Sequence, residues 1–179
     1  MVNNNIKVFD NHIQLPKLGK VKFAKSREVI GKIKSATIRR NPTGKYFVSI
    51  ACEVDIQELP NIDRKVGIAV GLKDFAITYD GLIVSDPKHF RKSEKRLAKL
   101  QKDLSRKEYG STNWNKDRIK VAKLHEKIKN QRTDFLQKIS TMLINENQVI
   151  VIEDLRISSL MKNRKLAKYI SEASCMNLE

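Results

Sequence analysis

The first sixty residues alternate short apolar runs with turn-forming residues. Asp10-Asn11, Pro16 and Gly19 separate the early runs, and the turn sequence Asn-Pro-Thr-Gly joins the two longest. Several short strands with turns between them predict a small β-barrel or sandwich in this part of the chain. The runs are Ile6–Phe9, His12–Leu15, Lys20–Phe23, Lys32–Arg40 and Lys45–Asp55.

The pattern changes after Asp63. Residues 66–70 (VGIAV) form a continuous apolar run, which is typical of a strand buried on both faces. Two further strands, Asp74–Tyr79 and Leu82–Ser85, flank the hairpin signal Asp80-Gly81. This order predicts an antiparallel meander. A second fully apolar strand is expected at Gln148–Glu153.

Between the strands at Leu82–Ser85 and Gln148–Glu153, apolar residues recur every three or four positions, as in amphipathic helices. A break at Tyr109–Asn115 divides it into two helices, which should pack as an antiparallel hairpin. A last helix is expected at Arg164–Ala173. The whole chain therefore reads as α/β. The apolar positions of the hairpin are Phe90, Leu97, Leu100, Leu104, Val121, Leu124, Ile128, Phe135, Ile139 and Met142.

The excess of positive charge predicts a polyanionic partner. The chain has 36 Lys and Arg against 20 Asp and Glu, a net charge of +16. Between Asp86 and Asp134 the counts are 16 and 7, so much of the excess lies on the predicted hairpin. Such a ridge favours the phosphate backbone of a nucleic acid; the alternative is a solvated helix face. The predicted contacts are Lys92, Lys95, Lys99, Lys102, Arg106, Lys107, Lys116, Arg118, Lys120, Lys123 and Lys127.

Other chemistry is sparse. The two cysteines, Cys52 and Cys175, are too far apart for a CxxC pair, so we expect reduced thiols, Cys52 at a strand-core position, and no zinc ribbon. The N-terminal sequence lacks the apolar core of a signal peptide, and no apolar run approaches the ~18 residues of a membrane span. These features predict a cytoplasmic protein without membrane contact.

Four motifs in order carry a family resemblance: VGIAVGLKDFAITYDG, RKSEKRLAKLQKDLSRKEYGS, RIKVAKLHEKIKNQRTDFLQKIS and VIVIEDLRISSLMKNRKLAKYISEAS. Together with HIQLPKLGKVKF, GKIKSATIRR and GKYFVSIACEV upstream, they resemble TnpB, the RNA-guided nuclease encoded beside insertion-sequence transposases. The resemblance implies a partial RNase H-like (RuvC-type) domain at residues 61–179 with a helical insertion at 87–146. It also implies a partial wedge-like, oligonucleotide-binding barrel at residues 1–60, with DNA and guide RNA as partners.

The resemblance also carries the family's catalytic positions. Its nucleases hold Mg²⁺ with carboxylates at strand ends. Its first catalytic Asp falls on Ala69, whose methyl group cannot ligate a metal, and its catalytic Glu falls on Glu153. Its third Asp and its zinc ribbon lie beyond the sequence in hand, so we expect neither a bound metal nor unaided cleavage. Asp74 and Asp154 are alternative ligands, although such residues more often cap turns or helices.

The sequence does not assign a single role to four further side chains. His89 and His125 lie among basic residues of the predicted helices and are expected to face phosphates or solvent. Tyr109 and Trp114 lie in the loop between the helices, where Trp114 either stacks on a base or packs locally. We also expect exposed sheet edges or apolar faces, since later elements of the family's sheet have no counterpart here.

Three hypotheses for function remain open at this point. The first is a nuclease-inactive, nucleic-acid-binding derivative of the family. The second is one half of a split nuclease completed by a separate C-terminal chain, which Ala69 disfavours because that ligand belongs to this half. The third is a decayed insertion-sequence reading frame without a selected function.

Overall fold

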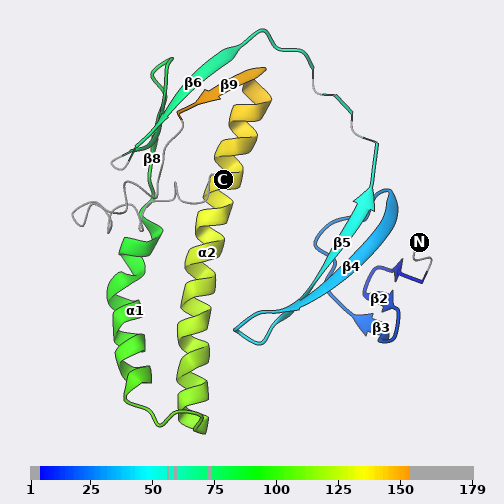
Figure 1. Cartoon of the computed structure of the whole chain (residues 1–179), viewed down its shortest axis with the longest axis vertical. Helices are drawn as coiled ribbons and strands as arrows, with labels where there is room; N and C mark the ends of the chain where they lie inside the picture. The colour runs from blue at the N-terminus through cyan, green and yellow to red at the C-terminus, as the bar shows by residue number, and fades with distance from the viewer. Residues whose placement is uncertain (1–4, 56, 59, 72–73, 154–179) are drawn as a thin grey trace. The chain divides into compact units, whose positions relative to one another are not determined.

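A computed structural model describes residues 5–55, 57–58, 60–71 and 74–153 (Figure 1). The chain divides into two compact units, Met1–Glu58 and Leu59–Glu179. The first holds strands β1–β5, and the second holds β6–β8, helices α1 and α2, and β9. The helix predicted at Arg164–Ala173, and the predictions for Asp154 and Cys175, lie outside the described residues.

The first unit contains two sheets that share one apolar core. Ile13, almost completely buried, lies in the core with Leu15, and Ile33, Val48 and Ile50 of the other sheet pack against them. The two sheets fit the sandwich alternative, whereas a closed barrel stays a prediction. The strands are β1 (Lys7–Val8), β2 (His12–Leu15) and β3 (Gly19–Lys22) in one antiparallel sheet, and β4 (Lys32–Arg40) and β5 (Tyr46–Glu53) in the other.

Burial alternates along the second strand of the longest hairpin. Val48, Ile50 and Cys52 are half-buried along β5, and the residues between them are exposed. In the turn before β5, Gly44 has a φ of +87° and donates its N–H to the Asn41 carbonyl at 2.9 Å. A side chain is disfavoured in that left-handed conformation, which explains the glycine at this position.

The second unit is built on a four-stranded sheet in the order β8-β7-β6-β9. The first three strands form the predicted antiparallel meander. The fourth follows the helices in sequence and returns to pair with β6 in parallel. The strands are β6 (Lys65–Val70), β7 (Asp74–Thr78), β8 (Ile83–Ser85) and β9 (Val149–Ile152).

Two helices, α1 (His89–Ser105) and α2 (Thr112–Glu146), form the predicted antiparallel hairpin (Figure 1). The break between them lies at residues 106–111 rather than at Tyr109–Asn115, because Ser111 caps α2; Trp114 therefore lies in the first turn of α2 and not in the loop. Leu97 of α1 and Leu124 and Ile128 of α2 are buried together between them. No helix in the described part of the chain combines the length and apolarity that crossing a membrane requires.

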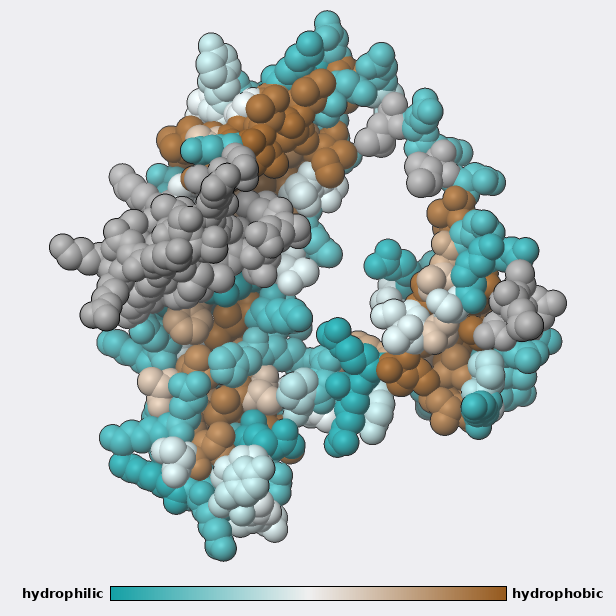
Figure 2. Space-filling model, in the orientation of Figure 1, coloured by the Kyte–Doolittle hydropathy of each residue, from teal (hydrophilic) through white to brown (hydrophobic). Residues whose placement is uncertain are grey.

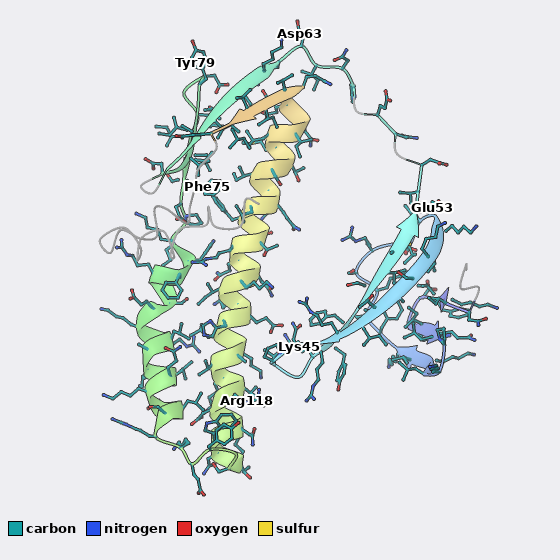
Figure 3. All side chains as sticks on the ribbon, in the orientation of Figure 1. Lys45, Glu53, Asp63, Phe75, Tyr79 and Arg118 are labelled. Atoms are coloured by element: carbon teal, nitrogen blue, oxygen red, sulfur yellow. The ribbon has the colours of Figure 1, made fainter. Side chains whose placement is uncertain are left out.

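The second half of α2 covers one face of the sheet. Its residues Phe135, Leu136, Ile139 and Leu143 pack against a buried cluster in the strands that includes Phe75. The rings of Phe75, labelled in Figure 3, and Phe135 meet edge to face, with centroids 5.1 Å apart. One helix therefore belongs to both the sheet core and the hairpin core.

The opposite face of the sheet is apolar and open. Ala69, Ile77, Val149 and Val151 are exposed on β6, β7 and β9, and Figure 2 shows apolar side chains gathered over β6 and β9. The expectation that the VGIAV strand is buried on both faces is therefore wrong for the described residues. A continuous apolar run shows that both faces are apolar, but it does not show that both are covered.

Arg64 links three elements at one end of this unit. Its guanidinium pairs with Asp80 in the β7–β8 turn at 2.5 Å and lies 3.8 Å from Glu146 at the end of α2. Its carbonyl accepts the N–H of Gln148 at 2.8 Å, just before β9. The hydroxyl of Thr78, and then Arg64, hold the pKa of Asp80 below its ordinary value.

The sheet core gives the first testable prediction. Phe75 is 3% exposed, and Phe75→Ala removes its contact with Phe135, so we expect a loss of about 3 to 5 kcal/mol in the free energy of unfolding. Tyr79 is 95% exposed and serves as the control, because Tyr79→Ala should change this value by less than about 0.5 kcal/mol. Urea unfolding followed by circular dichroism measures both. Equal effects of the two substitutions would contradict the packing.

Candidate nucleic-acid interface

The hairpin carries two stripes of lysines. Each member is three or four residues from the next, which places it on the same side of its helix. From Lys92 to Lys102, ten steps along the helix, the stripe of α1 is about 15 Å long. We call these positions the basic stripes: Lys92, Lys95, Lys99 and Lys102 on α1, and Lys116, Lys120, Lys123 and Lys127 on α2.

The predicted contacts are more exposed than four acids of the same two helices. Of the eleven predicted contacts, ten are exposed and Arg118 is half-buried. In contrast, Glu94, Asp103, Asp117 and Glu126 are all half-buried. The solvent-facing surface is therefore more positive than the count of residues suggests.

Few of these cations are neutralised by acids. Within the part of the chain that the structure describes, Lys120 is the one member of the eleven with an ion pair, to Asp117 at 2.7 Å. That contact raises the pKa of Lys120 and lowers the pKa of Asp117. A second pair on α2, Lys138 with Asp134 at 2.7 Å, lies outside the predicted set.

A basic hollow of about 320 Å³ lies between the helices. Lys92 and Lys127, one from each stripe, line it together with His89 and Arg96. Arg96 was not among the residues singled out from the sequence, although it follows Lys92 by one helical turn. Burial, and then the charge of Lys92, lower the pKa of His89. The hollow thus gathers cationic groups from both helices, and burial together with the charge of Lys92 disfavours the protonated form of His89.

The far end of the hairpin carries an aromatic pair. The rings of Tyr109 and Trp114 lie 4.7 Å apart, between centroids, at an angle of 60°. The guanidinium of Arg118, labelled in Figure 3, lies over the Trp114 ring at 5.9 Å. Arg118, a predicted phosphate contact, therefore also packs against an aromatic ring, and His125 is exposed as predicted.

The sheet brings the two family catalytic positions together. Parallel pairing places Ile68 opposite Ile152, so the next residues along the two strands are Ala69 and Glu153. Both are exposed, and neighbouring strands lie about 5 Å apart. The side chain of Asp74 accepts a hydrogen bond from Ser85 at 3.5 Å. No three His, Cys, Asp or Glu side chains converge among the described residues, which do not include Asp154.

Comparison with known proteins identifies the family. Residues 49–164 match the OrfB_IS605 family, described as "Probable transposase". The chain is 44% identical over 144 residues to a protein from Streptomyces pristinaespiralis named "Putative RNA-guided DNA endonuclease", covering 80% of this chain. It is 36% identical over 155 residues to "Putative RNA-guided DNA endonuclease InsQ" from Escherichia coli, covering 86% of this chain. The chain therefore belongs to the OrfB family of insertion-sequence proteins, the TnpB family.

The match covers only part of these relatives. It spans 36% of the length of the Streptomyces protein and 38% of the length of InsQ. The family is thus established, but the activity and partners of the whole relatives reach this chain only as proposals.

The position of His89 predicts a pH effect on stability. The unfolded chain takes up a proton at His89 near pH 6.5, whereas the folded protein resists protonation to a lower pH. The folded state therefore loses stability at this residue as the pH falls from about 6.5 through the folded pKa.

The substitution His89→Gln should remove that part of the loss. Urea unfolding at pH 7.5 and at pH 5 measures it, and the wild-type chain is expected to lose more stability than the variant. His125→Gln, at an exposed histidine of the same helix pair, is the control. An identical pH dependence in the wild-type and His89→Gln chains would contradict this account of the hollow.

Proposed function

We propose that this chain binds DNA and guide RNA through the basic stripes of its helical hairpin, and that it does not cut nucleic acid by itself. The observation that carries the proposal is the segregation of charge on the hairpin. The stripe lysines are exposed, and only one of them is ion-paired in the described part of the chain, while the neighbouring acids are half-buried.

This arrangement suits contacts to phosphates. Each lysine that neutralises a phosphate releases condensed counterions, a gain that does not depend on the base sequence. A stripe about 15 Å long covers several successive phosphates of one strand, which follow one another about every 3.4 Å of helix axis. Backbone contacts of this kind recognise the shape of a duplex and leave sequence recognition to base pairing.

The fold supports an RNase H-like (RuvC-type) assignment for the second unit. The proposal rests on its antiparallel meander of three strands, the helical crossover and the fourth strand returning parallel to the first. The Streptomyces protein and InsQ are each named "Putative RNA-guided DNA endonuclease", which is consistent with DNA and RNA as partners. The first unit is proposed to be part of a wedge-like oligonucleotide-binding barrel.

We expect no cleavage because residue 69 is an alanine at the position where the family has a catalytic Asp. Two-metal nucleases surround their cations with several oxygen ligands. Beside Glu153 the neighbouring strand offers the methyl group of Ala69, which supplies none. The same residue disfavours the alternative of one half of a split nuclease, because a partner chain that supplied further ligands would still leave position 69 without an oxygen.

The stripe of α1 predicts how binding depends on salt. With an RNA–DNA duplex as ligand, the triple substitution of Lys95, Lys99 and Lys102 by Gln should weaken binding. It should also reduce the slope of log K against log salt concentration by about 2 to 3, since each lost phosphate contact removes roughly 0.9. Fluorescence anisotropy of a labelled duplex between 50 and 300 mM salt measures both quantities.

A matched variant separates charge from side-chain identity. Replacing the same three lysines by Arg keeps the positive charges and should retain the affinity and most of the slope. Lys138→Gln tests a lysine of α2 that is already paired with Asp134, and it should have little effect. Binding that is insensitive to salt in the wild-type chain would overturn the proposal.

Position 69 gives a separate prediction for cleavage. Ala69→Asp restores a carboxylate beside Glu153, yet we expect neither the wild-type chain nor this variant to cut a guide-matched DNA in Mg²⁺ or Mn²⁺. Two-metal nucleases use several oxygen ligands, and no group of three acidic, His or Cys side chains converges among the described residues. Gel analysis of labelled DNA measures cleavage. Metal-dependent cleavage by the wild-type chain that is lost in Glu153→Gln would contradict the inactive assignment.

A further inference from the structure

At the tip of the hairpin, an exposed tyrosine ring contacts a tryptophan ring. We call Tyr109, Trp114 and Arg118 the tip cluster. Tyr109 is 85% exposed although its ring contacts Trp114 at 4.7 Å. Trp114 is half-buried, and the Arg118 guanidinium lies over its ring at 5.9 Å. The cluster therefore presents the Tyr109 ring to solvent, in contact with a partly buried neighbouring ring.

Hydrogen bonds stabilise the turn that carries the cluster. The Ser111 hydroxyl accepts the N–H of Trp114 at 3.1 Å and so caps the start of α2. The side-chain amide of Asn115 donates to the carbonyls of Gly110 and Ser111, both at 3.1 Å. Gly110 has a φ of +80°, a conformation that glycine adopts without strain. These contacts fix the backbone of the turn on which Tyr109 and Trp114 lie.

The surroundings of the tip cluster are cationic. Arg106, Lys107 and Lys116 are exposed around the turn, and the acid Asp117 is engaged by Lys120 at 2.7 Å. Glu108 is the exposed acid of this turn. An aromatic surface flanked by an excess of positive charge fits a nucleotide, which has a flat base and an anionic phosphate, better than it fits a protein partner.

We propose that the tip cluster is a stacking site for an unpaired nucleobase of single-stranded RNA or DNA, with Tyr109 contacting the base and Lys107 and Lys116 its phosphates. Such sites tolerate many sequences because every base has a π-face. The proposal rests on the proposed function and extends it. The basic stripes hold the backbone, and the tip cluster adds a contact to a base that pairing leaves free.

The chain contains a single tryptophan, so its intrinsic fluorescence reports on the tip cluster. Titration with a single-stranded oligonucleotide is expected to change the Trp114 emission. An abasic oligonucleotide of equal length keeps the phosphates and lacks the bases, and it should bind more weakly and leave the emission nearly unchanged. Anisotropy of labelled oligonucleotides gives the affinities.

Substitutions at Tyr109 separate stacking from packing. Tyr109→Ala should weaken binding of the normal oligonucleotide by about 5- to 150-fold and leave binding of the abasic one unchanged. Tyr109→Phe should keep the wild-type affinity. Tyr109→Leu keeps apolar contact with Trp114 but lacks a flat ring, so it should behave like Tyr109→Ala. Tyr79→Ala, at an exposed tyrosine on the sheet, is the matched control and should have no effect.

The outcomes distinguish this proposal from the one on which it rests. If a duplex binds in a salt-sensitive way but Tyr109→Ala leaves single-strand affinity unchanged, the stacking site is refuted and the basic stripes stand. If neither duplex nor single strand binds, both proposals are overturned. Binding of a protein partner that depends on Tyr109, with no preference for normal over abasic oligonucleotide, would also refute the stacking site.

Discussion

The packing of one long helix organises the second unit. Helix α2 runs unbroken for 35 residues, about 52 Å. Its second half, including Phe135 and Ile139, forms the core with the sheet, and its first half, including Leu124 and Ile128, forms the core of the hairpin. Because the same helix belongs to both cores, the hairpin is tied to the sheet by apolar burial rather than by a loop. The placement of every cation on the hairpin depends on this continuity.

In the hairpin and in the sheet, one face is buried in a core and the other is exposed. The residues on the exposed faces are those available to bind a partner. In the hairpin, apolar residues and half-buried acids turn inward and lysines turn outward, so a modest excess of positive charge becomes a strongly positive surface. In the sheet, α2 covers one face, and the other displays Ala69 and Glu153 on neighbouring strands. The hairpin carries exposed lysines suited to phosphate, whereas position 69 has a methyl group where the family resemblance places a carboxylate. Binding without cleavage is the function that this combination supports.

Local signals in the sequence predicted local structure well. The strands at His12–Leu15 and Lys32–Arg40 and the meander follow from turn residues and apolar spacing. The existence of a break between the helices was also predicted, but its position was several residues too late, since α2 begins at Thr112. Long-range features were harder. Parallel pairing of β9 with β6 joins segments separated by the whole hairpin, and a run such as VGIAV does not reveal which face is covered. The basic stripes could be read from spacing, but their exposure relative to the acids, the hollow with Arg96, and the contact of Arg118 with Trp114 depend on how two helices pack. Ala69 and Glu153 were found through family resemblance, and their adjacency came from the strand register.

The central claim is that the basic stripes are the surface that meets nucleic acid. Lysine acetylation followed by mass spectrometry, on the chain alone and bound to an RNA–DNA duplex, tests it at the level of single residues. The account predicts that Lys95, Lys99, Lys102 and Lys123 lose reactivity on binding, whereas Lys138, already paired with Asp134, changes little. Unchanged reactivity along both stripes in a saturated complex would contradict it.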